Sequence, residues 1–218
     1  MLPLTLKLLC CIIPSEVIET TEENAMFYLK KPARDTIQQY LTLRRDDCFS
    51  YSAVEGTRDK NAPERYVVDH NRVRLGSGRE VFEQAKTALR QWEMFNLGWI
   101  QLCWPETPVE VGSTVGVLAR LGGVWSLNLC RIVYVIGEAD DAVETFGFAY
   151  GTLPDHAERG EERFTVEWYQ ADDSVWYDIF AFSRPKQLLA QIGYPVARRL
   201  QKRFAVDSMA AMCRVIGN

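Results

Sequence analysis

The sequence has little that would hold a metal ion or a polyanion. It contains only two histidines, His70 and His156, and its six cysteines form no CxxC pair and no Cys/His cluster. Its 25 lysines and arginines are outnumbered by 29 acidic residues, which gives a net charge of −4. No overall basic field is therefore present to attract nucleic acid. We expect no metal, no cofactor and no nucleic-acid partner.

The sequence also lacks an apolar run of the roughly 20 residues that cross a bilayer. Its N-terminal stretch MLPLTLKLLCCIIPS is interrupted by Lys7 and has no basic region ahead of the apolar residues, unlike a signal peptide. We interpret residues 1–25 as an extension ahead of the domain or as the product of an upstream start site, and a short targeting or membrane-surface segment is the alternative. The scattered cysteines are typical of reduced, buried thiols, so we predict a cytoplasmic protein without stable membrane insertion.

Residues 26–218 read as one globular domain. Apolar residues at helical spacing predict a helix around Ile37 and Leu41, and alternation predicts a strand in CFSYSAVEGT and an extended segment in ERYVVDHNRVRLG. REVFEQAKTALRQWEMF has the pattern of an amphipathic helix, and Ser77 and Glu80 have the spacing of a capping box at its start.

From Gly98 onward the pattern is almost wholly that of strands. The predicted strands are GWIQLCW, TVGVLARLG, VWSLNLCRIVYVIG, AVETFGFAYG, RFTVEWY and VWYDIFAF. A long C-terminal helix follows, with Ser183 as its predicted N-cap, Pro185 in its first turn and a kink or division near Pro195. Grouped strands predict an α+β fold rather than a parallel dinucleotide-binding sheet. We expect a curved antiparallel sheet of about six to seven strands around the C-terminal helix.

Four segments carry a resemblance to a known family: RVRLGSGREVF, NLCRIVYV, GFAYGTLPDHAERGEERFTVE and VWYDIFAFSRP. Together they resemble the family named domain of unknown function 1990, whose members are similar to the START-like, or helix-grip, superfamily. The resemblance extends over about residues 26–218. It implies a deep apolar cavity between the sheet and the C-terminal helix, and it implies no particular activity.

Two aromatic rows are candidates for the wall of such a cavity. Phe146, Phe148 and Tyr150 share one side of a predicted strand, and Phe164 and Trp168 share one side of the next. Aromatic rings would give an apolar ligand large and stiff contacts, and the Tyr150 hydroxyl would orient it. The alternative is that these rings simply fill the core.

Arg131 is a candidate for binding a polar group of the ligand. It shares the parity of Leu127 and Leu129 on a face that is otherwise apolar, so its guanidinium requires a carboxylate or a bound anion. Glu167 or Asp178 on neighbouring strands would supply the carboxylate of a structural ion pair. If a bulge shifts the parity, Asn128 and Tyr134 face inward instead.

The segment TLPDHAERGEE holds the densest group of proton-transfer residue types in the chain. His156 is the weak catalytic candidate there, as a general acid or base at the mouth of the cavity. A charged, solvated hairpin loop is the alternative, and the ligand spacing of a zinc site is lacking.

Three function classes follow. The preferred one is an uncharacterised ligand-binding domain for an apolar or amphipathic small molecule. The alternatives are an enzyme of the cyclase or hydrolase type found in the superfamily, using the same cavity, and a non-catalytic interaction protein with a filled core.

Overall fold

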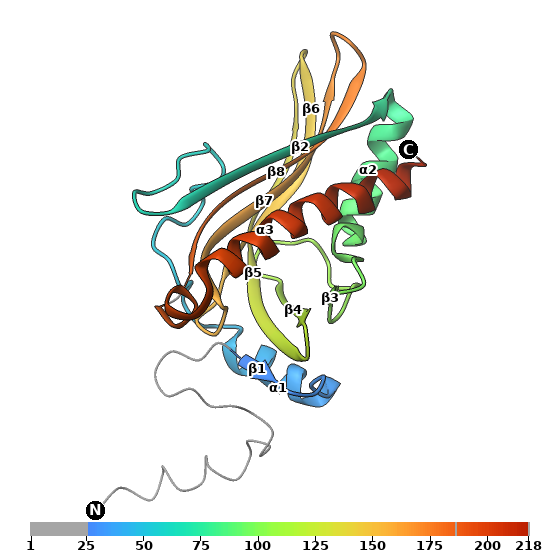
Figure 1. Cartoon of the computed structure of the whole chain (residues 1–218). Coiled ribbons are helices and arrows are strands. Elements are labelled where there is room, and N and C mark those ends of the chain that lie inside the picture. Colours follow the sequence, from blue (N-terminus) through green and yellow to red (C-terminus); the bar gives the residue numbers. More distant parts are fainter. Residues whose placement is uncertain (1–25, 186, 218) are drawn as a thin grey trace, which may run out of the picture.

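The computed structural model describes residues 26–185 and 187–217. The interpretation of residues 1–25 as an extension lies outside the described residues. The chain folds into one curved antiparallel sheet with helices on both of its faces (Figure 1).

The sheet has the strand order β2-β8-β7-β6-β5-β4-β3, and β1 pairs with β5 as an additional strand. Its strands are β1 (Met26–Tyr28), β2 (Val67–Ser77), β3 (Ile100–Leu102), β4 (Thr114–Leu121), β5 (Val124–Ala139), β6 (Val143–Thr152), β7 (Glu158–Tyr169) and β8 (Ser174–Pro185). Strands β4 to β8 follow one another as antiparallel neighbours, and β2 returns to pair with β8. Six long strands and two three-residue strands confirm the predicted fold class.

Within the described residues, three α-helices and a short 3-10 helix cover the sheet. These are α1 (Arg34–Arg44), α2 (Arg79–Arg90), η3 (Glu93–Phe95) and α3 (Gln187–Ile216). Figure 1 shows α3 running along the sheet, with α2 beside its C-terminal end. We call the face toward α3 the inner face and the opposite one the outer face. α1 packs on the outer face, because Ile37 and Leu41 lie in one cluster with Leu127 and Leu129 of β5.

The core under α2 is densely aromatic. The strongly amphipathic pattern of this helix buries Phe82 and Leu89 against the inner face, where Trp92, Phe148 and Phe164 complete the cluster. The rings of Trp92 and Phe148 meet edge to face with their centroids 4.8 Å apart. This end of the sheet is therefore filled by side chains.

Several local predictions are wrong. The segment 48–57 forms bends and turns instead of a strand, because it lies across the outer face and is held there by side chains. Ser77 belongs to β2, where its hydroxyl accepts a hydrogen bond from Arg74, and α2 begins at Arg79 with Gly78 as its N-cap residue and no side-chain cap. Ser183 and Pro185 belong to β8, and α3 is a single helix that contains Pro195.

Within residues 26–185 and 187–217, no helix is long and apolar enough to cross a membrane. Of the cysteines in these ranges, Cys48, Cys103, Cys130 and Cys213 are free thiols. Cys48 is exposed, which differs from the predicted burial.

Candidate functional site

A cavity of about 380 Å³ lies between the inner face of the sheet and α3. Its apolar wall comes from η3, from β3, β4 and β8, and from α3. The apolar residues of this wall include Phe95, Trp99, Ile100, Val117, Ala119, Leu121, Ile179, Leu200 and Phe204. The polar residues come from β2, β5 to β8, the turn between β6 and β7, and α3: Asp69, Asn71, Ser126, Asn128, Tyr150, Thr152, His156, Glu158, Glu161, Glu162, Ser183 and Gln201. The cavity thus offers a large apolar surface and a set of hydrogen-bonding groups.

Glu162 is the central acidic group of the cavity. It stands on β7 opposite Tyr150 of β6, and the Tyr150 hydroxyl donates a hydrogen bond of 2.8 Å to Glu162 Oε2. The pKa of Glu162 is raised to about 7, mainly by burial and also by the nearby Glu158 and Asp69 carboxylates, while the hydrogen bond from Tyr150 opposes the rise. The side chain keeps some accessible surface because it faces the cavity. Glu162 therefore changes protonation near neutral pH.

Glu158 is the second carboxylate on the cavity wall. Gln201 Nε2 of α3 lies 2.6 Å from each of its two oxygens and 2.9 Å from Ser183 Oγ of β8. Burial raises the pKa of Glu158, and its hydrogen bonds with Gln201 and Ser183 oppose the rise. This carboxylate also connects β7 to α3.

A second connection holds α3 against the edge strand β2. Arg198 donates from both terminal nitrogens to the two oxygens of Asp69, at 2.5 and 2.7 Å. Bidentate pairing of this kind fixes geometry as well as charge. The positive charge of Arg198 is thereby matched to Asp69.

The turn between β6 and β7 contributes His156 and Ala157 to the wall of the cavity. Asn128 Oδ1 of β5 accepts a hydrogen bond of 3.1 Å from the backbone N–H of Ala157. His156 Nδ1 accepts one of 2.9 Å from the backbone N–H of Glu158. His156 therefore lines the cavity and its Nδ1 shapes the turn, while its role as a general acid or base stays a prediction.

The predicted aromatic row does face inward, but only Tyr150 lines the cavity. Phe146, Phe148, Phe164 and Trp168 lie in the buried aromatic core beneath α2. The structure therefore places four of the five predicted aromatic contacts in the filled part of the inner face. These four rings therefore fill the core, which was the alternative interpretation.

Arg131 lies on the outer face, so its predicted role in the cavity is wrong. Its guanidinium donates to the carbonyl oxygens of Arg45 and Asp47, at 2.6 and 2.7 Å, and stacks over the Phe49 ring. The charge is satisfied by backbone dipoles at the end of α1, and neither Glu167 nor Asp178 takes part.

The alternative, in which a bulge turns Asn128 and Tyr134 inward, describes the position of Asn128 but not that of Tyr134. Asn128 faces the cavity, whereas Tyr134 lies on the outer face with its hydroxyl 2.7 Å from Thr57 Oγ1. A bulge between Ile132 and Tyr134 separates the two positions.

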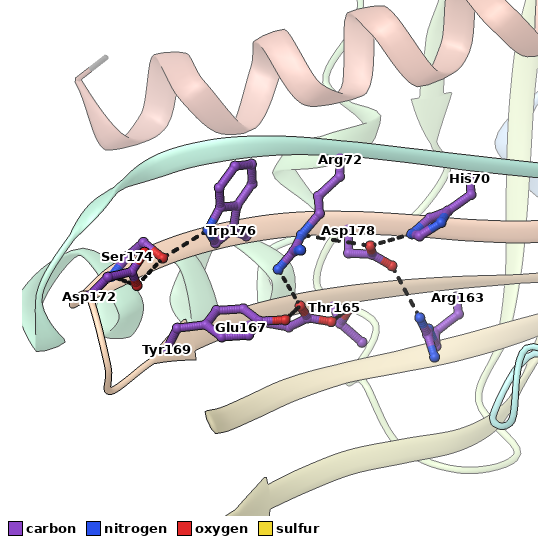
Figure 2. A network of polar contacts seen from close by, with 10 residues as sticks. All are labelled: His70, Arg72, Arg163, Thr165, Glu167, Tyr169, Asp172, Ser174, Trp176 and Asp178. Carbon is purple, nitrogen blue, oxygen red and sulfur yellow. Dashed lines mark hydrogen bonds and ion pairs between the residues drawn. The ribbon is translucent and has the colours of Figure 1, made fainter. Parts of the chain in front are cut away.

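Asp178 also lies on the outer face, at the centre of the polar network in Figure 2. It accepts from His70 Nε2 at 2.6 Å and from Arg163 at 3.1 Å, and Arg72 pairs with the neighbouring Glu167 at 2.7 Å. Three strands, β2, β7 and β8, contribute to this network (Figure 2). Its groups bind one another across the sheet, and Asp178 is not a cavity residue.

Glu161, next to Glu162 in the chain, is the anchor of the segment 51–57 on the outer face. It accepts hydrogen bonds from Tyr51 at 2.6 Å, from the backbone N–H groups of Glu55 and Thr57 at 2.9 Å each, and from the Thr57 hydroxyl. Gly151 makes room for this arrangement, because a Cβ atom there would lie 2.2 Å from the Tyr51 hydroxyl.

The roles of Glu158 and Glu162 were not predicted from the sequence, where both lie in the charged segment TLPDHAERGEE and a solvated hairpin loop was the alternative to a site at the cavity mouth. The structure places them on β7, which begins at Glu158. The available signal was parity, since Glu162 continues the alternation of Phe164, Val166 and Trp168 toward the N-terminus of the strand. Among the described residues, no group of three or more His, Cys, Asp or Glu side chains is arranged to hold a metal ion.

Comparison with known proteins identifies relatives across most of the chain. A "UPF0548 protein" of Dictyostelium discoideum is 40% identical over 209 residues, covering 88% of this chain and 97% of that protein. A "UPF0548 protein" of Deinococcus radiodurans is 33% identical over 203 residues, covering 88% of this chain and 100% of that protein.

Among solved structures, Ara h 8.0201 is similar to the chain with a TM-score of 0.44 and 15% identity, over 70% of this chain and 99% of that one. Residues 50–211 match the model of the family described as "Domain of unknown function (DUF1990)". The chain therefore belongs to the DUF1990 family.

Proposed function

We propose that the protein binds an amphipathic small molecule in the cavity between the sheet and α3. The observation that carries this proposal is a cavity of about 380 Å³ with an apolar wall and a polar group centred on Glu162 and Tyr150. Its volume is in the range of small-molecule sites, which combine apolar walls with a few orienting polar groups. The apolar body of the ligand would lie against Val117, Leu200 and Phe204, with its polar head at Glu162.

The rigidity of the surrounding elements supports the proposal. Asp69–Arg198 and Glu158–Gln201 fix α3 to β2 and β7, and the packed core beneath α2 fixes the far end of the sheet. A cavity whose walls are held in this way loses little conformational entropy when a ligand enters. The space is therefore suited to binding.

Native mass spectrometry of the protein purified from its own source tests the proposal. We expect a mass excess over the denatured chain, and a small molecule in the organic extract. Ala119→Phe would place a ring in the cavity and should remove the excess. Ala139→Phe makes the same change at an exposed position and should retain it.

A ligand-free wild-type protein that binds none of a panel of amphiphiles would contradict the proposal. Thermal shift provides this second measurement, because a ligand that binds only the native state raises its stability by about 2.7 kcal/mol at a hundredfold excess over Kd.

Catalysis in the same cavity is the second candidate, and the raised pKa of Glu162 favours it. A carboxyl group that titrates near pH 7 beside a tyrosine hydroxyl has the properties of a general acid or base. Glu162→Gln should then abolish turnover of any substrate found while leaving its binding measurable. Turnover that survives this change would exclude Glu162 as the acid or base.

A further inference from the structure

We infer that the ligand carries a protonated amine, which Glu162 and Glu158 bind at the polar part of the cavity. This inference rests on the proposed function and specifies the class of molecule: an organic amine with an apolar body. It is drawn from the charges on the cavity wall and from how far each of them is satisfied within the protein.

The first observation is the sign of the charge on the wall. Of the residues whose side chains are described, Asp69, Glu158, Glu161 and Glu162 line the cavity, and no lysine or arginine does. Arg198 is matched to Asp69, and Glu161 directs its carboxylate to the outer face. Arg198 also lies close enough to Glu158 to lower the pKa of that carboxyl group, so Glu162 is the inward carboxylate that pairs with no lysine or arginine among the described residues.

The second observation is that the hydrogen-bond donors of these two carboxylates are electrically neutral. Gln201 and Ser183 hydrogen-bond with Glu158, and Tyr150 donates to Glu162. Tyr150 binds Glu162 Oε2, which leaves the second oxygen of this cavity-lining side chain without a hydrogen-bond partner among the described residues. A buried carboxylate gains most from a charged donor, because such hydrogen bonds are roughly twice as strong as neutral ones.

A protonated amine satisfies both observations. An ammonium group supplies up to three N–H donors and a positive charge, so one group can bind the open oxygen of Glu162 and attract Glu158. A carboxylate head would be repelled by both glutamates, and a hydroxyl head would leave their charge uncompensated. The apolar wall then selects for a hydrocarbon body on the same molecule.

The test compares three probes with the same hydrocarbon chain and different heads. Octylamine is a cation at neutral pH, octanol is neutral and octanoate is an anion. Their affinities for the full chain are measured by isothermal titration calorimetry at pH 7.5. The variants are Glu162→Gln and, as a matched control, Glu138→Gln on an exposed part of β5.

We expect octylamine to bind about tenfold or more tightly than octanol, since a charge-assisted hydrogen bond is roughly twice as strong as a neutral one. Octanoate should bind most weakly. Glu162→Gln should reduce the affinity for octylamine to that for octanol while leaving octanol binding within about twofold. Glu138→Gln should change none of the three affinities.

The outcomes separate this inference from the proposed function. If octanol or octanoate binds as tightly as octylamine, the ligand-binding function stands and the inferred amine is wrong. If octylamine is preferred equally by wild type and Glu162→Gln, the assignment of the head group to Glu162 is wrong. If no probe binds and the purified protein carries no ligand, the proposed function itself fails, and this inference with it.

Discussion

Glu161 and Glu162 are neighbours in the chain, and the alternation of β7 places them on opposite faces of the sheet. On the outer face, Glu161 accepts four hydrogen bonds from Tyr51, Glu55 and Thr57. On the inner face, Glu162 accepts one hydrogen bond, from Tyr150, among the described residues. The two glutamate side chains are chemically identical, yet they accept very different numbers of hydrogen bonds.

The difference distinguishes a structural carboxylate from one available to a ligand. The donors around Glu161 belong to a segment without regular structure, and this carboxylate replaces the hydrogen bonds that a helix or strand would have provided. Among the described residues, the cavity around Glu162 supplies no comparable set of hydrogen-bond donors. Each of the following experiments would break or sharpen this contrast.

The largest expected effect belongs to Glu161→Gln. The amide would turn one acceptor oxygen into a donor that faces the N–H groups of the segment 51–57. We expect a loss of about 4 kcal/mol in the free energy of unfolding, the magnitude seen when a buried charged partner is removed. Urea denaturation measures it, with Glu138→Gln as the exposed control. A loss below about 1 kcal/mol would show that solvent replaces these hydrogen bonds.

The next largest effect is the pH dependence that Glu162 imposes on stability. Its pKa in the folded state, about 7, lies above the ordinary value of 4.5, so the native state holds the proton more tightly than the unfolded chain. Stability therefore falls as pH rises between these values, and above pH 7 the penalty reaches about 3 kcal/mol.

Comparison of wild type with Glu162→Gln isolates this contribution. The groups that face Glu162 are Tyr150, Glu158 and Asp69, with Arg198 near Glu158, and all of them remain in the variant. We expect the stability of the variant relative to wild type to increase steadily from pH 4.5 to pH 8. Parallel pH profiles would mean that water in the cavity solvates the carboxylate.

A smaller effect is expected from Tyr51→Phe. The change removes one of the four donors to Glu161 and leaves the ring in place against Gly151, so we expect a loss of about 1.5 kcal/mol. Thermal unfolding measures this loss. A loss equal to that of Glu161→Gln would show that the tyrosine hydroxyl holds the segment by itself.

The smallest effect on folding is expected from Tyr150→Phe, which acts on the pKa of Glu162 instead. The Tyr150 hydrogen bond lowers that pKa, so its removal should raise the value above about 7. Carbon-detected NMR of labelled glutamate side chains follows the titration. A pKa that falls in the variant would place another, stronger donor at Glu162.

The sequence was sufficient for the fold class, because grouped strands with clear alternation lead to an antiparallel sheet. It was insufficient for choosing the inner face of β5. Leu127 and Leu129 are apolar, yet they lie beneath α1 on the outer face, while Cys130 and Ile132 belong to the inner core. When a sheet is covered on both sides, apolar parity no longer identifies the cavity.

The candidate site was missed for a related reason. Glu158 and Glu162 were assigned to a loop because charged residues between two apolar strands usually face solvent. Their partners Gln201 and Tyr150 lie on other elements, and sequence proximity to Glu158 gives no indication of Gln201 on α3. Burial of a carboxylate depends on the tertiary structure, so a local sequence pattern does not predict it.

Because β5 is packed on both of its faces, few of its positions can accept a different side chain. In a strand with one solvated face, every second position accepts polar or bulky replacements. Between Leu127 and Ile132, one set of side chains meets α1 and the other meets the cavity wall and core, so a change at either parity disturbs a packed layer. This stretch of β5 therefore has little freedom to diverge in sequence.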